Sequence, residues 1–230
     1  MSLGYHAALQ LCAKGYCITI ACRNIDKAKN ACASIIKRSG NNASIDFIII
    51  DMSELSLVSK SVNYLSQFYL LNELIGVATP KEGVKIIALT STLHKFLCPK
   101  ISLRRDRLQK MFSPPNGTSG WLSYARSKLS IAMLACYLDR IEGIQATAVH
   151  PGAVSTSLSN NISPHMRKIL KTMHVSRFLS RVEDGARNVV ECVEKSHLPN
   201  TFRNGTKYNT VSKRISSERN GINLMMLARK

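Results

Sequence analysis

The sequence predicts an α/β fold with a doubly wound parallel sheet. Short apolar runs of strand length alternate with amphipathic segments of helix length, which indicates successive β-α-β units. Because such units cross over in a right-handed sense, helices cover both faces of the sheet. The chain has 230 residues, of which 45% are hydrophobic and 20% charged, with no internal repeat and no linker. We therefore expect one domain over residues 1–230, with ligands at the carboxyl ends of the strands.

The first 50 residues contain two helix–strand pairs. Residues 5–14 have an amphipathic helical pattern, and the apolar run 16–22 suits a strand buried on both faces. Residues 26–38 predict a second helix, for which Asp26 is a candidate N-cap. Residues 45–50 predict a second buried strand.

The rest of the chain continues the alternation of helices and strands. Residues 121–141 predict a long helix, and the apolar run 144–150 predicts a strand that stops at Pro151. The other expected elements are helices at 53–71, 164–180 and 183–195, strands at 84–90 and 206–210, and a basic loop at 95–119.

Basic residues exceed acidic residues by a wide margin. The chain has 32 Lys and Arg against 14 Asp and Glu, which gives a net charge of +18. Such an excess suits an anionic partner, which would be a nucleic acid, a lipid surface or a phosphorylated cofactor. No zinc finger, helix-turn-helix or RNA-binding signature accompanies the charge, so nucleic acid is the least favoured of the three.

The cysteines and the first residues bear on the compartment. Seven cysteines occur without a C-x-x-C pair, which predicts reduced, buried thiols in a reducing compartment and no metal site. The first residues lack the cationic and apolar regions of a signal peptide. No apolar run is long enough to span a bilayer. We therefore expect a protein on the cytoplasmic side.

One helical pair of residues suits proton transfer. Tyr124 and Lys128 stand at positions i and i+4, so their side chains share one face of the predicted helix. A cation held near a phenol favours the phenolate and lowers the pKa of the tyrosine. Such a pair can exchange a proton with an alcohol oxygen. The spacing alone occurs in many helices, so its weight depends on the surrounding sequence.

The surrounding sequence matches a known family. The chain resembles the short-chain dehydrogenase/reductase family, and within it the retinol-dehydrogenase-like branch. The resemblance implies a Rossmann-type sheet in which Tyr124 is the general acid/base, Lys128 assists it and binds the nicotinamide ribose, and Ser91 orients the substrate oxygen. The matching segments, in the expected order, are "GYHAALQLCAKGYCITIACRN", "IALTSTLH", "YARSK" and "VHPGAVST".

The resemblance also implies a set of cofactor-binding residues. Arg23 would stand where the adenosine 2′ position is recognised, and a basic residue there suits NADP (NADPH) over NAD. Asp51 and Met52 would bind the adenine edge. The remaining expected contacts are Gly4 at the phosphates and Pro151, Gly152 and Thr156 at the nicotinamide end, together with Tyr124 and Lys128.

Two parts of the family pattern are missing. Only the last glycine of the T-G-x-x-x-G-x-G turn is present, as Gly4, and the first strand that precedes this turn is absent. The segment "YLLNELIG" resembles the run into the N-N-A-G strand end, so we expect a strand that ends at Ile75. Only eight residues then precede Val84, too few for a crossover helix, and the relay asparagine is lost. We therefore expect an incomplete sheet, from N-terminal truncation and an internal deletion.

A basic segment at residues 164–180 lies in the substrate-lid region implied for residues 157–182. Its basic residues interleave with apolar ones, and no acidic residue occurs between Glu142 and Glu183. This pattern suits contact with a membrane surface that admits a lipid substrate. It also suits a lid helix whose apolar face covers the pocket and whose basic face is in water. Both interpretations stay open, and a second basic segment forms the tail at 211–230.

The resemblance implies an NADP-dependent oxidoreductase that transfers a hydride between the cofactor and an alcohol or carbonyl group. The expected small-molecule substrate is a lipid such as a retinoid, steroid or polyprenol, and a homo-oligomer stays open. The protein would be soluble, or peripherally attached to the endoplasmic reticulum or a lipid droplet. The alternative, suggested by the missing segments, is a catalytically inactive relative or truncated product that acts as a binding protein.

Overall fold

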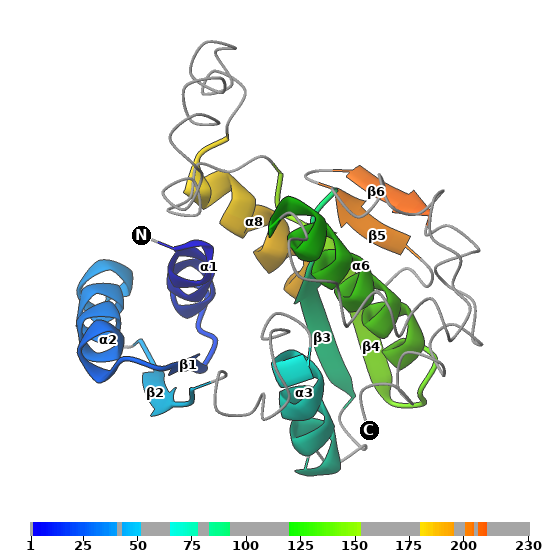
Figure 1. Cartoon of the computed structure of the whole chain (residues 1–230). Coiled ribbons are helices and arrows are strands. Elements are labelled where there is room, and N and C mark those ends of the chain that lie inside the picture. Colours follow the sequence, from blue (N-terminus) through cyan, green and yellow to red (C-terminus); the bar gives the residue numbers. More distant parts are fainter. Residues whose placement is uncertain are drawn as a thin grey trace. The chain divides into compact units, whose positions relative to one another are not determined.

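The computed structural model describes two compact units of α-helices and parallel strands (Figure 1). The first unit combines Met1–Asp51 with Pro151–Glu194, and the second combines Met52–His150 with Lys195–Lys230. The residues that the structure describes are 2–40, 43–51, 65–77, 83–92, 120–152, 180–195, 201–204 and 207–210. Helices alternate with strands along these residues, so the predicted α/β fold with parallel strands is confirmed.

The first unit contains a two-stranded parallel sheet. Strand β1 pairs with β2, and Ile18 lies opposite Ile45. The helical cap that the sequence predicts at Asp26 is wrong, because Asn24 has the extended backbone of a cap and its Oδ1 accepts from the Lys27 backbone N–H at 2.8 Å. Asp26 lies in the first turn instead. The elements are α1 (Leu3–Cys12), β1 (Ile18–Cys22), α2 (Ile25–Ser39), β2 (Ile45–Ile49) and α8 (Val182–Glu194).

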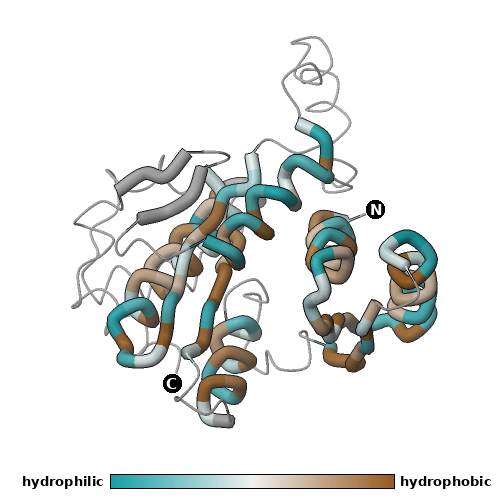
Figure 2. The backbone as a smooth tube through the Cα atoms, turned by 180° about the vertical axis from the view of Figure 1, so that it is seen from behind, coloured by the Kyte–Doolittle hydropathy of each residue, from teal (hydrophilic) through white to brown (hydrophobic). Residues whose placement is uncertain are grey.

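Both α1 and α2 pack on one face of this sheet (Figure 2). Tyr5 and Ile35 are buried there, with Ile18, Ile20 and Ile45 packed against them. The other face carries the alternate residues of the two strands, and Ile48 on it is 46% exposed. The prediction that these strands are buried on both faces is therefore wrong. Apolar composition alone does not show that two helices share one face.

Helix α8 is joined to α1 by polar contacts. The Lys14 ammonium binds the Glu194 carboxylate at 2.7 Å, and the Gln10 side-chain amide donates to the Glu183 carbonyl at 3.0 Å. The Asn188 side chain donates to the Pro151 carbonyl at 3.0 Å, so α8 also fixes the residue that follows β4.

The second unit contains a four-stranded sheet in the order β3-β4-β5-β6. Strands β3, β4 and β5 are parallel, and β6 is antiparallel to β5. The strand expected at 206–210 is β6. Sequence periodicity does not predict β5, because its four residues lack an apolar run. The elements are α3 (Leu65–Val77), β3 (Val84–Leu89), α6 (Gly120–Leu138), β4 (Ile144–His150), β5 (Thr201–Asn204) and β6 (Lys207–Thr210).

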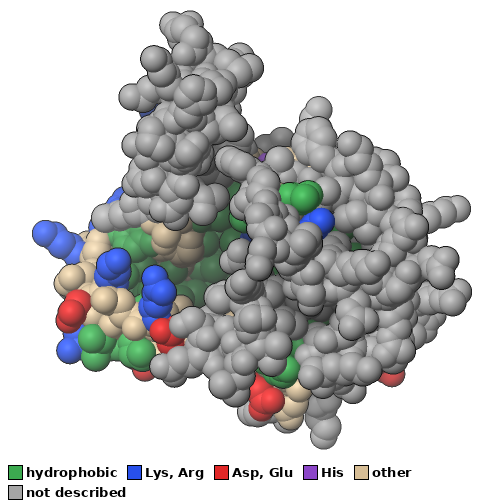
Figure 3. All heavy atoms as spheres, in the orientation of Figure 1, with side chains coloured by type: hydrophobic (Ala, Val, Ile, Leu, Met, Phe, Trp, Pro, Cys, Tyr) green, Lys and Arg blue, Asp and Glu red, His purple; other side chains and the backbone are tan. Residues whose placement is uncertain are grey.

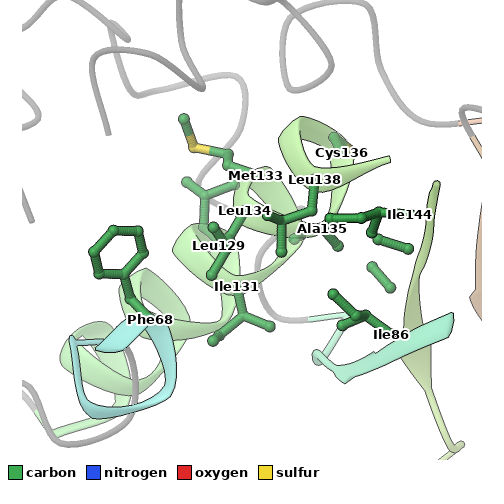
Figure 4. Packing of buried hydrophobic residues seen from close by; sticks show 13 residues of the cluster. Phe68, Ile86, Leu129, Ile131, Met133, Leu134, Ala135, Cys136, Leu138 and Ile144 are labelled. Carbon is green, nitrogen blue, oxygen red and sulfur yellow. The ribbon is translucent and has the colours of Figure 1, made fainter. Parts of the chain in front are cut away.

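The core of the second unit is centred on α6. Figure 4 shows Leu129, Ile131 and Met133 of this helix beside Phe68 of α3 and Ile86 of β3. The residues from Leu129 to Leu138 are almost all buried, which is typical of a helix enclosed on all sides. The long helix predicted at 121–141 is thus confirmed and carries the main core cluster.

Residues 65–77 are helical, so the expected strand ending at Ile75 is wrong. Phe68, Leu71 and Ile75 follow helical spacing and pack against the core cluster. The segment is rich in leucine and polar helix formers and has no β-branched run, which favours a helix over a strand. The argument for a missing crossover helix depended on that strand, and α3 occupies this position instead.

The expected incomplete sheet is confirmed by the pairing of the described strands. These strands form two separate sheets, in which β1 pairs only with β2 and β3 pairs only with β4. No described strand pairs with both β1 and β3.

Several sequence predictions lie outside the described residues. They are the basic loop at 95–119, the lid region at 157–182 with its helix at 164–180, most of the helix at 53–71, the tail at 211–230, and Met52 and Thr156. Within the part of the chain that the structure describes, no helix has the length and apolarity needed to cross a membrane. The same part holds no cluster of three or more side chains suited to a metal ion.

Candidate active site

The structure brings three predicted catalytic residues together in the second unit. Tyr124 and Lys128 lie one turn apart on α6, and the Lys128 Nζ is 5.7 Å from the centre of the Tyr124 ring. Ser91 follows the carboxyl end of β3, and its buried side chain hydrogen-bonds Tyr124. The arrangement therefore places a phenol, a hydroxyl and an ammonium at the end of a parallel strand, where ligands bind in such sheets.

Two reciprocal hydrogen bonds join α6 to the end of β3. The Lys128 ammonium donates to the Leu89 carbonyl at 2.8 Å. The Thr90 hydroxyl donates to the Lys128 carbonyl, also at 2.8 Å. The sequence does not predict the roles of Leu89 and Thr90. Leu89 acts through its backbone carbonyl, which every residue type has. Thr90 belongs to no motif of its own and is noticed only as the neighbour of Ser91.

Burial has opposite effects on the two titratable groups of the site. It raises the pKa of Tyr124, and the hydrogen bond from Ser91 opposes this by favouring the phenolate. Burial lowers the pKa of Lys128. The sequence-based expectation that Lys128 holds the Tyr124 pKa below its ordinary value is therefore wrong for this arrangement, in which the ammonium is bonded to Leu89.

Apart from Tyr124 and Lys128, the expected cofactor residues that the structure describes lie in the first unit. Arg23 follows β1 and is exposed. Figure 3 shows several Lys and Arg side chains at lower left. Asp51 comes shortly after β2. Pro151 and Gly152 follow β4, and Gly152 has φ +101°, a left-handed conformation that favours glycine.

The amino end of α1 has room for an anionic group. Gly4 lies in the first turn, and a Cβ built on it would meet no atom within 4 Å. The first turn has no acidic residue, and the Ser2 hydroxyl accepts from the Tyr5 backbone N–H at 3.3 Å. Exposed N–H groups and the helix dipole favour phosphate at such an end. The open space beside Gly4 and the lack of an acidic residue in the first turn are compatible with a phosphate at this end, although the Tyr5 N–H is already held by Ser2.

Comparisons with curated proteins find distant oxidoreductases. No protein-family model matches the chain. The WW domain-containing oxidoreductase of Homo sapiens is 23% identical over 236 residues, and that of Pongo abelii is 22% identical over the same length. Both alignments cover 85% of this chain and 56% of the relative, so the chain spans little more than half the length of these proteins.

Comparisons with solved structures decide the fold. A short-chain dehydrogenase/reductase from Serratia marcescens matches with a TM-score of 0.62 at 15% identity, covering 94% of each chain. The chain has the short-chain dehydrogenase/reductase fold. Salutaridine reductase from Papaver somniferum matches with a TM-score of 0.60 at 12% identity, covering 88% of this chain and 96% of that one. An alternative dihydrofolate reductase from Brucella suis in complex with NADP matches with a TM-score of 0.59 at 10% identity and 89% coverage of each.

The described strands form two sheets, with β1 and β3 in different ones. The separation of β1 from β3 is the departure already seen in the strand pairing. The candidate catalytic residues are nevertheless all on one side of that separation, in the second unit.

Proposed function

We propose that this chain is an NADP-dependent oxidoreductase that transfers a hydride between the cofactor and an alcohol or carbonyl group. The observation that carries the proposal is the convergence of Tyr124, Lys128 and Ser91 at the end of β3. The oxidoreductases among the distant relatives and the NADP-bound structural neighbour support the same activity. When bound, NADPH supplies the hydride, and the protein side chains provide the proton and the positioning.

Tyr124 is the proton donor of the proposed reduction. Because burial raises its pKa, Tyr124 keeps its phenolic proton at neutral pH. It would pass that proton to the carbonyl oxygen as this oxygen gains negative charge. Ser91, which hydrogen-bonds the Tyr124 side chain, would orient the same oxygen. The arrangement therefore favours carbonyl reduction at neutral pH and alcohol oxidation at higher pH.

Lys128 supports the proton transfer and the cofactor. Its ammonium is held at the Leu89 carbonyl, within 5.7 Å of the centre of the Tyr124 ring. From there it would bind the hydroxyls of the nicotinamide ribose and help restore the proton of Tyr124.

Residues after β1, β2 and β4 and at the start of α1 would hold the two ends of NADP. Arg23 carries an exposed guanidinium after β1, a position suited to charge-assisted bonds with a 2′-phosphate. Asp51 and Met52 would contact the adenine edge, and Gly4 would allow the phosphates to approach α1. Pro151, Gly152 and Thr156 would line the nicotinamide end.

A lipid alcohol or carbonyl is the proposed substrate class. The retinol-dehydrogenase-like resemblance supports a retinoid, steroid or polyprenol. The basic and apolar residues at 164–180 support contact with a membrane surface, and with it peripheral attachment to the endoplasmic reticulum or a lipid droplet.

One observation favours the alternative of an inactive relative or truncated product that acts as a binding protein. The described strands form two sheets instead of one, so β1 and β3 each pair on one side only. A chain of this kind would bind NADPH weakly or not at all, and it would not turn over substrate.

Incubation with NADPH and a panel of carbonyl compounds distinguishes the two candidates. We expect the wild-type chain to consume NADPH with retinal or a steroid ketone faster than with a short aldehyde. Tyr124→Phe, which removes only the phenolic hydroxyl, should abolish consumption while leaving the thermal unfolding transition in place. Equal rates for wild type and Tyr124→Phe would exclude the proposed chemistry, and zero rates for both would favour the binding protein.

A further inference from the structure

Thr90 links the two elements that carry the candidate catalytic residues. It stands directly between Leu89, whose carbonyl holds the Lys128 ammonium, and Ser91, which hydrogen-bonds Tyr124. Its own hydroxyl donates to the Lys128 carbonyl at 2.8 Å, and Thr90 is only 4% exposed. Three consecutive residues at the end of β3 therefore all contact one turn of α6.

The side of the sheet on which Thr90 lies follows from the strand pattern. Ile86 and Ala88 of β3 pack against the α6 core cluster, and Thr90 continues this alternation by two residues. Its hydroxyl is thereby directed at α6. The bond does not replace a helical bond of Lys128, because a carbonyl oxygen has two lone pairs and can accept a second donor.

We propose that Thr90 is a positioning residue of the active site, which holds the Tyr124–Lys128 turn of α6 in register with Leu89 and Ser91. The proposal rests on the proposed function of this site as the centre of a hydride-transfer reaction. Without the Thr90 hydroxyl, the helix is still joined to the sheet by apolar packing, which does not specify a distance to a few tenths of an ångström. The polar contacts at the reacting end would then lengthen while the core stays intact.

The expected chemical consequence concerns Tyr124. The hydrogen bond from Ser91 lowers the Tyr124 pKa against the effect of burial. If the end of β3 moves away from α6, this bond weakens, and the pKa of Tyr124 rises further. The phenol would then ionise at higher pH, and proton transfer at a fixed pH would become slower.

The test compares Thr90→Val with Thr90→Ser. Valine matches the shape of threonine but has no hydroxyl, whereas serine keeps the donor. We expect Thr90→Val to lower kcat for carbonyl reduction by about tenfold or more, with KM for the carbonyl compound nearly unchanged. Thr90→Ser should restore most of the rate. A buried threonine on the opposite face of the sheet, Thr147, supplies the control Thr147→Val, which should leave kcat unchanged.

A second measurement separates this inference from the proposed function. The ionisation of Tyr124 is followed as the difference in tyrosinate absorbance between each chain and the same chain carrying Tyr124→Phe. We expect Thr90→Val, and Thr90→Ala if the valine variant does not fold, to raise the pH of this ionisation, and Thr90→Ser to leave it near the wild-type value. An unchanged ionisation in Thr90→Val would overturn the positioning role even in an active enzyme. An upward shift in a chain that turns over no substrate would uphold the role and refute only the proposed activity.

Discussion

At the scale of single residues, the candidate site depends on three polar side chains, two on α6 and one just after β3. Tyr124 keeps its proton because it is buried, Ser91 partly offsets this effect, and Lys128 is held by a backbone carbonyl. The sequence could predict Tyr124, Lys128 and Ser91, since a motif specifies residue types and spacing. It could not predict the partner of the Lys128 ammonium, because any residue type at position 89 offers the same carbonyl.

The pH dependence of the proposed reaction follows from Tyr124. Its raised pKa means that carbonyl reduction should persist at neutral pH and fall only as the phenol loses its proton at alkaline pH. Ser91→Ala removes the hydrogen bond that favours the phenolate. The alkaline limb of the pH–rate profile should therefore move to higher pH, and the maximal rate should fall. Rates of NADPH consumption across the alkaline range measure both effects. A limb that moves to lower pH in Ser91→Ala would contradict the assigned hydrogen bond.

At the scale of elements, most of the helices and strands could be predicted from apolar periodicity. The errors occurred where periodicity carries little information. A cap depends on the backbone at one residue, which made Asn24 and not Asp26 the cap of α2. The resemblance of residues 69–76 to a strand end predicts a strand, although their own composition favours a helix. The exposed face of β1 and β2 depends on where the helices dock, which no single strand encodes.

The cap of α2 gives a prediction with a matched control. Asn24→Ala removes the acceptor of the Lys27 N–H and should lower the free energy of unfolding by about 1 kcal/mol. Asp26→Ala removes only a charge near the amino end of the helix and should cost about 0.5 kcal/mol. Denaturant unfolding of the two variants measures the difference. A larger loss for Asp26→Ala than for Asn24→Ala would contradict the observed cap.

Helix α3 gives a second prediction at this scale. Phe68 is 3% exposed and Leu74 is 56% exposed, whereas a strand would place these two residues, six apart, on the same face. Phe68→Ala should therefore cost about 3–5 kcal/mol of unfolding free energy, and Leu74→Ala less than about 0.5 kcal/mol. Similar large losses in both variants would indicate a strand.

At the scale of the whole molecule, the division of the described strands into two sheets is the feature that most constrains function. The candidate catalytic residues Tyr124, Lys128 and Ser91 lie in the second unit, while Gly4, Arg23, Asp51, Pro151 and Gly152, which are proposed to contact NADP, lie in the first. The net charge of +18 suits an anionic partner. Some of the basic residues that produce it are those proposed to contact the cofactor phosphates and a lipid surface.

At this scale we predict that binding of the cofactor stabilises the folded chain. A ligand that binds only the folded chain stabilises it, by about 2.7 kcal/mol at one hundred times its Kd. We expect NADPH to raise the Tm more than NADH does, and Arg23→Ala to remove most of that difference. The exposed Lys29 of α2 provides the control Lys29→Ala, which should keep it. Equal shifts with the two cofactors would contradict the proposed recognition of the 2′-phosphate.

The most direct test of the central claim follows the hydride itself. NADPH carrying deuterium at the transferable position is incubated with retinal and the wild-type chain, and the retinol formed is analysed by mass spectrometry. The account predicts deuterium in the product alcohol with wild type and no product with Tyr124→Phe. Unlabelled product from wild type, or labelled product at equal rates from both chains, would contradict it.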